Sequence, residues 1–218
     1  PFIVFDDADL DLAVEGALVS KFRNGGQTCV CANRILVQAG VYDAFAKKLA
    51  DRVDAMRVGP GTEAGVSIGP MINEPAITKI RAHVEDALAK GAKIITRPRP
   101  LPEGPQYTAP IVLTGATTGM RLASEETFGP VAPLFRFETE EEAIAIANGT
   151  DYGLVAGVWT ADGGMRCVES WLYERSLAAE AVPVVQVNGI SADGQMLVGQ
   201  LEGERAFIAS VRPRWPLS

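Results

Sequence analysis

Short apolar runs alternate with longer stretches of helical spacing over the first 160 positions of this 218-residue chain. The runs are rich in β-branched, aliphatic and aromatic residues, which is typical of buried strands. The predicted strands cover residues 2–5, 34–38, 93–96, 111–113 and 131–137. Because helices of about ten or more residues separate several of these strands, crossover connections are expected between them. The pattern therefore predicts an α/β fold with a largely parallel sheet and helices on both faces.

Apolar residues that recur three or four positions apart predict four helices. These helices cover residues 9–22, 41–53, 74–90 and 140–148. Asp9 is expected to cap the first helix, and Thr139 and Glu142 form a T-x-x-E capping box before the fourth. Gly91 and Gly149 follow the third and fourth helices, where glycine commonly ends a helix.

The third predicted helix carries the only histidine of the chain, His83. The apolar stripe of this helix is expected to consist of Ile77, Ile80, Val84 and Leu88. His83 lies outside this stripe, and we predict a solvated helix histidine. Histidine-based zinc sites and Ser-His-Asp triads lack their parts unless this one residue supplies them, so no metal site is predicted.

Four prolines between positions 98 and 105 shape the segment 97–107. Proline fixes the backbone and removes an amide donor, which predicts an exposed extended loop rather than a strand. The RPRP sequence at 97–100 is expected to be solvated surface.

Composition and charge exclude several classes of protein. A chain with 47% hydrophobic and 22% charged residues is an ordinary globular protein rather than a disordered, collagen-like or disulfide-stapled one. The net charge of −7 provides no general attraction for nucleic acid or anionic membranes, so neither is an expected partner. No apolar run approaches the roughly 18 residues of a membrane span. Three cysteines in a chain of this length fit a reducing compartment, and we expect a cytoplasmic location.

The segment 22–29, FRNGGQTC, places two glycines and several polar residues between a helix and a strand and ends on Cys29. Such a loop allows the backbone to approach a ligand closely. A thiol there is a candidate nucleophile if backbone amides or a cation such as Arg23 stabilise the thiolate. On these residues alone, a passive small residue is an equally good interpretation of Cys29.

The motif F-x-x-x-G-Q-x-C in segment 22–29, followed by CANRILVQ, resembles the active-site cysteine region of the aldehyde dehydrogenase superfamily. Residues 21–34 as a block are similar to its succinate-semialdehyde branch. Further similar motifs follow the family's order: PFIVFDDADLD, VGPGTEAGVSIGPMIN, MRLASEETFGPVAPLFRF and ANGTDYGLVAGVWT. Residues 1–160 are therefore identified as a portion of the family's catalytic domain, and 161–218 as a divergent tail. For this tail our hypothesis is an altered or shifted reading of the gene.

The resemblance implies that an aldehyde, in particular succinate semialdehyde, is oxidised to the acid with NAD or NADP through a cysteine thiohemiacetal and thioester. It places the nucleophile at Cys29 and the contact to the substrate's distal carboxylate at Arg23, whose guanidinium suits a carboxylate. It also assigns Glu126 to the nicotinamide ribose and Phe128 to the nicotinamide face. Without the resemblance, these two would be a surface carboxylate and a core aromatic, and Arg23 a surface arginine.

Cys31 resembles a second thiol that, in some members of the family, closes a reversible disulfide with the nucleophile. Residues two apart form a disulfide only in irregular backbone, and many such pairs never do. A metal site at Cys29 and Cys31 lacks further ligands nearby. A thiol redox protein that works through these two cysteines remains an alternative from a different class.

The family's cofactor domain, its oxyanion-stabilising asparagine and its general-base glutamate precede the position that corresponds to Pro1. We therefore expect a portion of such an enzyme, and the main alternative is a catalytically inactive fragment. The choice between NAD and NADP depends on residues of that other domain. The family forms homo-oligomers, but their pairing strand is not recognisable in the tail, so a homo-oligomer is doubtful for this chain.

Overall fold

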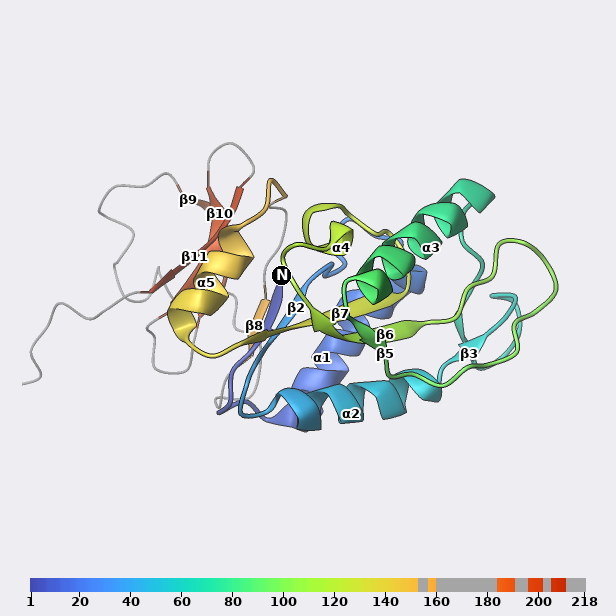
Figure 1. Ribbon diagram of the computed structural model, residues 1–218, viewed down its shortest axis with the longest axis horizontal. Helices are drawn as coiled ribbons and strands as arrows, with labels where there is room; N and C mark the ends of the chain where they lie inside the picture. The colour runs from blue at the N-terminus through green and yellow to red at the C-terminus, as the bar shows by residue number, and fades with distance from the viewer. Residues whose placement is uncertain (153–156, 160–183, 191–195, 202–204, 211–218) are drawn as a thin grey trace, which may run out of the picture.

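A computed structural model describes residues 1–152, 157–159, 184–190, 196–201 and 205–210 (Figure 1). Within these ranges the main sheet has six strands in the order β5-β6-β7-β2-β1-β8. The strands are β1 (Phe2–Val4), β2 (Ile35–Gln38), β5 (Lys93–Ile94), β6 (Ile111–Ala116), β7 (Val131–Phe137) and β8 (Gly157–Trp159). All neighbouring strands run parallel except the pair β5 and β6. The predicted α/β fold with a largely parallel sheet is confirmed.

Helices cover both faces of this sheet (Figure 1). One face carries α1 (Leu10–Phe22) and α2 (Tyr42–Asp54), and the other carries α3 (Glu74–Ala89), α4 (Arg121–Ser124) and α5 (Glu140–Asn148). Successive strand side chains point to opposite faces. In β1, Phe2 and Val4 therefore pack against α1 and α2, whereas Ile3 joins the core under α3. A continuous apolar strand is what a sheet buried on both faces requires.

The predicted helix caps are present. The side chain of Asp9 accepts hydrogen bonds from the amides of Asp11 and Leu12 at the start of α1. Thr139 Oγ1 accepts from the amide of Glu142, whose carboxylate bonds back to the amide of Glu138. Each bond satisfies an amide that the helix itself leaves free.

The apolar stripe of α3 differs from the prediction at one end. Leu88 is 41% exposed, and His83 and Ala87 are buried instead. Ile77, Ile80 and Val84 are buried as predicted, and His83 and Ala87 complete the buried face in place of Leu88. The prediction of a solvated His83 is wrong, because its side chain has no exposed surface.

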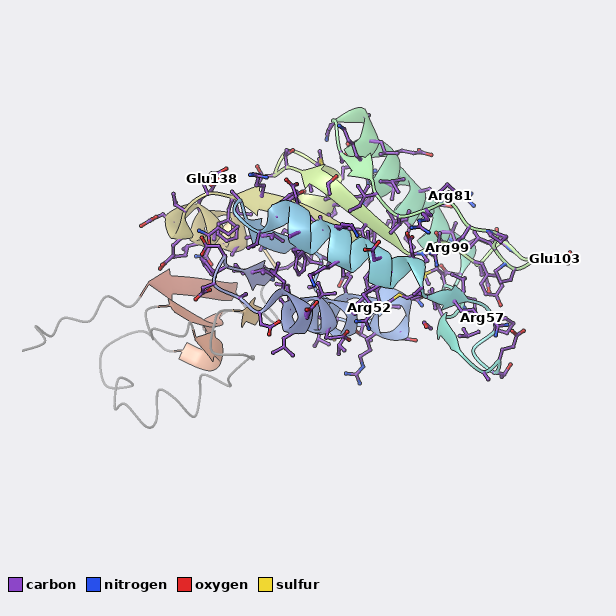
Figure 2. The ribbon with its side chains drawn as sticks, turned by 90° about the horizontal axis from the view of Figure 1, so that it is seen from below. Arg52, Arg57, Arg81, Arg99, Glu103 and Glu138 are labelled. Atoms are coloured by element: carbon purple, nitrogen blue, oxygen red, sulfur yellow. The ribbon has the colours of Figure 1, made fainter. Side chains whose placement is uncertain are left out.

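The proline-rich segment 97–107 forms no helix or strand, as predicted, but one of its arginines is not solvated. The guanidinium of Arg99 donates to the carbonyl oxygens of Val53 (3.1 Å) and Met56 (2.6 Å) and pairs with Asp54 (3.3 Å). Arg99 thus caps the C-terminal end of α2, where the helix leaves carbonyl groups free (Figure 2). A cation at this end of a helix is stabilising.

Two short strands outside the main sheet were not predicted, because two or three residues give little periodicity. β3 (Arg57–Val58) and β4 (Val66–Ile68) pair in parallel between α2 and α3. In the tail, β9 (Val184–Ile190), β10 (Met196–Leu201) and β11 (Arg205–Ser210) form an antiparallel sheet, with β11 beside α5 (Figure 1). Within the described ranges no helix is both long and apolar enough to cross a bilayer.

Candidate active site

The loop that carries Cys29 begins where α1 ends. The short helix η1 (Arg23–Gly26) contains three residues in the left-handed region: Asn24 with φ 50°, Gly25 with φ 65° and Gly26 with φ 76°. Asparagine and glycine tolerate this conformation best, so this sequence can reverse the chain sharply. A tight turn follows, in which the amide of Cys31 donates to the carbonyl oxygen of Thr28 (3.0 Å). Cys29 lies in the centre of this turn and is exposed.

The side chain of Gln27 fastens this loop to the segment between β4 and α3. Its Nε2 donates to the carbonyl oxygen of Asn24 (3.2 Å), and its Oε1 accepts from the amide of Ile72 (2.9 Å). Gly25 lies so close to Met71 that an added Cβ would come within 2.9 Å of its methyl carbon. Two neighbouring residues of the segment between β4 and α3 therefore hold the loop in place.

The two neighbouring thiols have different surroundings. Cys31 is buried, and its Sγ lies 2.8 Å from Thr28 Oγ1 and donates to the carbonyl oxygen of Arg23 at 3.7 Å. Cys29 is exposed, and both thiols are free. The backbone of Arg23 is thus fixed to the turn that presents Cys29, and its side chain is exposed. A disulfide between Cys29 and Cys31 stays a prediction.

A second segment, residues 125–129, lies directly against the cysteine loop. A Cβ on Gly26 would come within 2.2 Å of the carbonyl oxygen of Gly129, so two backbones touch where only glycine fits. A second contact joins the two regions, because the amide of Thr127 donates to Asn33 Oδ1 (3.1 Å). This segment contains Glu126 and Phe128, both half-buried, and Phe128 has a left-handed φ of 52°. The fold therefore brings Cys29 and this pair onto adjoining segments.

Lys21 lies at the end of α1, just before the cysteine loop, and its side chain is fully buried. Its Nζ has no hydrogen-bond partner in the part of the chain that the structure describes. Burial lowers the pKa of Lys21 to about 8. Within the described residues, Lys21 is thus an amine buried without a hydrogen-bond partner, at the point where α1 leads into the cysteine loop.

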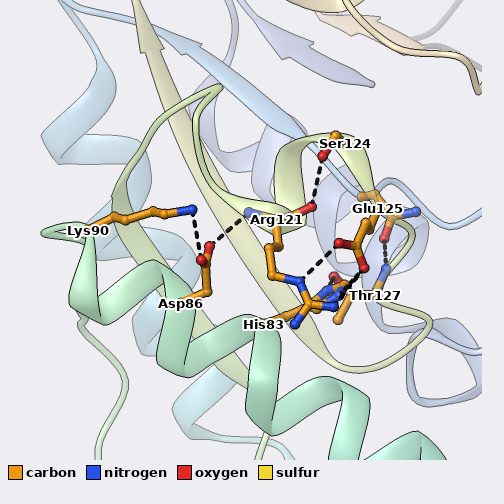
Figure 3. Close-up of polar contacts among 8 residues, drawn as sticks. His83, Asp86, Lys90, Arg121, Ser124, Glu125 and Thr127 are labelled. Atoms are coloured by element: carbon orange, nitrogen blue, oxygen red, sulfur yellow. Dashed lines mark hydrogen bonds and ion pairs between the residues drawn. The ribbon is translucent and has the colours of Figure 1, made fainter.

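His83 connects α3 to the segment 125–129 (Figure 3). Its Nδ1 lies 3.1 Å from Thr127 Oγ1 and its Nε2 lies 3.1 Å from Glu125 Oε2. Glu125 also accepts two hydrogen bonds from Arg121, at 2.9 and 3.0 Å. These bonds from Arg121 and His83 lower the pKa of Glu125 to about 2. Among the described residues, no group of three or more metal-ligating side chains is placed to hold a metal ion.

Sequence reasoning missed the residues that support the site: Lys21, Asn33, His83 and Thr127. One available signal pointed to His83, which lies three positions after Ile80 and four before Ala87 and so continues the buried stripe. No signal marked Lys21, because lysine is rarely buried without a partner.

Comparison with known proteins identifies the family. The sequence profile of the aldehyde dehydrogenase family matches residues 1–171. The chain belongs to this family. It is 56% identical over 164 residues to 3-sulfolactaldehyde dehydrogenase of Pseudomonas putida, an alignment that covers 75% of this chain and 34% of that protein. It is 52% identical over 162 residues to the NADP(+) succinate-semialdehyde dehydrogenase of Escherichia coli K12, covering 74% of this chain and 34% of that protein.

Solved structures of aldehyde dehydrogenases agree with this assignment. The crystal structure of succinate-semialdehyde dehydrogenase from Burkholderia pseudomallei superposes with a TM-score of 0.71 at 52% sequence identity, covering 81% of this chain and 36% of that one. The resemblance to the aldehyde dehydrogenase superfamily and its oxidoreductase class is confirmed. The chain spans about a third of the length of these relatives. The family uses NAD or NADP, and one of these relatives is named for NADP(+).

Proposed function

We propose that this aldehyde dehydrogenase chain carries the catalytic cysteine for oxidation of an aldehyde with a second, anionic group, such as succinate semialdehyde. The observation that carries the proposal is the backbone contact between Gly26 and Gly129. Because of this contact, the exposed thiol of Cys29 and the pair Glu126 and Phe128 lie on adjoining segments. A nucleophile beside groups that suit a nicotinamide is what this reaction requires.

Cys29 acts as the nucleophile in this proposal. Its sulfur attacks the aldehyde carbon, a carbon–sulfur bond forms, and the carbonyl oxygen takes up a proton to give a thiohemiacetal. NAD or NADP, when bound, supplies the acceptor for the hydride that leaves this carbon. The resulting thioester keeps the acyl group on Cys29 until water cleaves the carbon–sulfur bond, which releases the carboxylic acid and restores the thiol.

The residues of segment 125–129 fit the nicotinamide end of the cofactor. The half-buried carboxylate of Glu126 can accept hydrogen bonds from ribose hydroxyls, and the half-buried ring of Phe128 can pack against a flat ring. The buried Nζ of Lys21, which lacks a partner among the described residues, adds a positive charge near Glu126. A carboxylate at this position can accept from both ribose hydroxyls.

Arg23 is proposed to bind the distal anionic group of the substrate. Its side chain is exposed, and its backbone is fixed to the turn that carries Cys29. The relatives are named for 3-sulfolactaldehyde and succinate semialdehyde, and each of these compounds has an acid group besides its aldehyde. A guanidinium forms two parallel hydrogen bonds to such a group, which a plain aldehyde cannot offer.

The second candidate is a catalytically inactive portion of such an enzyme. It is favoured by one observation, namely that the chain spans only about a third of the length of its relatives. In this case Cys29 retains the position of a nucleophile, but the chain by itself neither transfers hydride to a cofactor nor releases an acid.

Reduced-cofactor absorbance separates the two candidates. The purified chain is mixed with succinate semialdehyde and NAD, then NADP, in reducing buffer, and Cys29→Ala serves as the control. Turnover by the wild-type chain that disappears in Cys29→Ala supports an active enzyme. Absence of reduced cofactor in both proteins supports the inactive portion, and turnover that survives in Cys29→Ala overturns the role of Cys29.

A further inference from the structure

His83 uses both of its ring nitrogens on one segment of the site. The ring has no exposed surface, and it lies between α3 and residues 125–127 (Figure 3). Nε2 faces the Glu125 carboxylate and Nδ1 faces the Thr127 hydroxyl, each at 3.1 Å. The two hydrogen bonds of this buried imidazole restrain the side chains of its partners as well as the ring itself.

The chemistry of the partners determines which nitrogen carries the proton. Arg121 holds the Glu125 carboxylate through two hydrogen bonds, and the low pKa of Glu125 keeps that group ionised. An ionised carboxylate only accepts, so Nε2–H of His83 donates to it. Nδ1 of the neutral ring then accepts from the Thr127 hydroxyl. Burial favours this neutral ring, as do the positive charges of Arg121 and of Lys79 on the same helix, whereas Glu125 opposes them.

The two partners of His83 flank Glu126. The Glu125 and Thr127 side chains are bonded to His83, and the Thr127 amide is bonded to Asn33. Phe128 follows in a left-handed conformation, which a residue with a Cβ adopts only when its surroundings impose it. The backbone around Glu126 is thus fixed on both sides by side chains that the cofactor does not need to touch.

We propose that His83 is a positioning residue that sets the direction of the Glu126 carboxylate and the Phe128 ring. It acts through Glu125 and Thr127. The proposal rests on the proposed function only for the identity of the ligand, the nicotinamide end of NAD or NADP. The arrangement of the segment itself follows from the contacts of His83.

The experiment uses the full 218-residue chain with isotope labels and follows the amide signals of residues 126 and 128 by NMR. His83→Phe fills the space of the imidazole and loses both hydrogen bonds, whereas His83→Gln keeps a donor for Glu125. Thr127→Val loses only the bond to Nδ1 at nearly constant volume, and Thr127→Ser keeps the hydroxyl. Ile77→Val shortens a buried side chain elsewhere on α3 and controls for general destabilisation.

The first readout is amide exchange, which requires no ligand. His83→Phe and Thr127→Val are expected to speed exchange at residues 126–128 by about five-fold or more while strands β6 and β7 are unchanged. Thr127→Ser and His83→Gln each keep a hydrogen-bonding group, so exchange at residues 126–128 is expected to stay close to the wild-type rate. The same is expected of Ile77→Val. Should His83→Phe fail to fold, the Thr127 pair alone decides the outcome. Equal exchange at 126–128 in Thr127→Val and Thr127→Ser overturns the proposal.

The second readout is the dissociation constant of nicotinamide mononucleotide, measured from the same two signals, with adenosine monophosphate as the control ligand. We expect the dissociation constant of nicotinamide mononucleotide to rise about five-fold or more in Thr127→Val and to stay near the wild-type value in Thr127→Ser. If the wild-type chain binds no nicotinamide mononucleotide at these residues, the cofactor role in the proposed function fails, and the exchange result still decides the role of His83. If all variants bind it equally, the proposed function stands and the positioning role is overturned.

Discussion

Lys21 has an amine that folding removes from water without a hydrogen-bond partner among the described residues. Burial lowers its pKa from the ordinary lysine value of 10.5 to about 8. Between these two pH values the unfolded chain binds more protons than the folded chain, so the free energy of unfolding rises with pH there. The whole difference corresponds to about 3 kcal/mol, which the folded chain loses at pH values below 8.

Lys21→Met is therefore expected to raise the free energy of unfolding at pH 7 by about 1–3 kcal/mol. This gain over the wild type should shrink steadily between pH 8 and 10.5, because the wild-type amine becomes neutral in both states. Urea unfolding at several pH values measures it. Lys47→Met is the matched control, since the side chain of Lys47 is 77% exposed. If the difference in free energy of unfolding between Lys21→Met and the wild type stays constant with pH, burial of the Lys21 ammonium does not destabilise the folded chain.

Arg23 is expected to select the substrate rather than to activate the thiol. In Arg23→Met, the concentration of succinate semialdehyde that halves the alkylation rate of Cys29 should rise about ten-fold or more, because a charged hydrogen-bonded contact is lost. The same concentration for butanal, which has no acid group, should not change. Arg23→Lys should lie between the two, since an ammonium keeps the charge and loses the paired geometry. Equal effects on both aldehydes would contradict the role of Arg23.

At the scale of elements, the site depends on the contact between the cysteine loop and segment 125–129. Gly26→Ala adds a Cβ within 2.2 Å of the Gly129 carbonyl oxygen, at a φ of 76°. The added Cβ forces the two segments apart and the left-handed φ strains the alanine, so we expect a loss of stability of about 2–4 kcal/mol.

Thermal unfolding and peptide-resolved alkylation of Cys29 measure the effect of Gly26→Ala. Gly61→Ala is the control, since a Cβ there would meet nothing within 4 Å and its φ is not left-handed. We expect Gly26→Ala to lower the melting temperature and to change the alkylation rate of Cys29, and Gly61→Ala to change neither by much. A Gly26→Ala protein as stable as Gly61→Ala would refute the close backbone approach.

Most elements were predictable from the sequence because their apolar periods are regular and their caps are explicit. Asp9 and Thr139 mark helix starts in the sequence and in the structure. The errors occur where a polar residue is buried with partners distant in sequence. His83 finds Glu125 and Thr127, and Arg99 finds the end of α2, through contacts that no local pattern reveals. Burial of a polar group depends on its partners, and these are set by the tertiary fold.

At the scale of the whole molecule, a six-stranded sheet within the described ranges brings together segments that lie nearly 100 positions apart. The alternation of strands and helices predicts such a sheet, but not which loops meet. The adjacency of the Cys29 loop to Glu126 and Phe128 was implied by resemblance alone, and the structure gives it a physical basis in Gly26 and Gly129. The strands of the tail pair among themselves, and Cys167 lies outside the described residues.

The most direct test of the central claim is the rate at which iodoacetamide alkylates Cys29, measured by peptide mass spectrometry with and without succinate semialdehyde. A thiohemiacetal occupies the sulfur, so we expect the aldehyde to slow alkylation of Cys29 and to leave alkylation of Cys31 and Cys167 unchanged. Removal of the aldehyde should restore the original alkylation rate of Cys29. Such protection requires neither hydride transfer nor thioester cleavage. Alkylation of Cys29 at the same rate at every aldehyde concentration would contradict its role as the nucleophile.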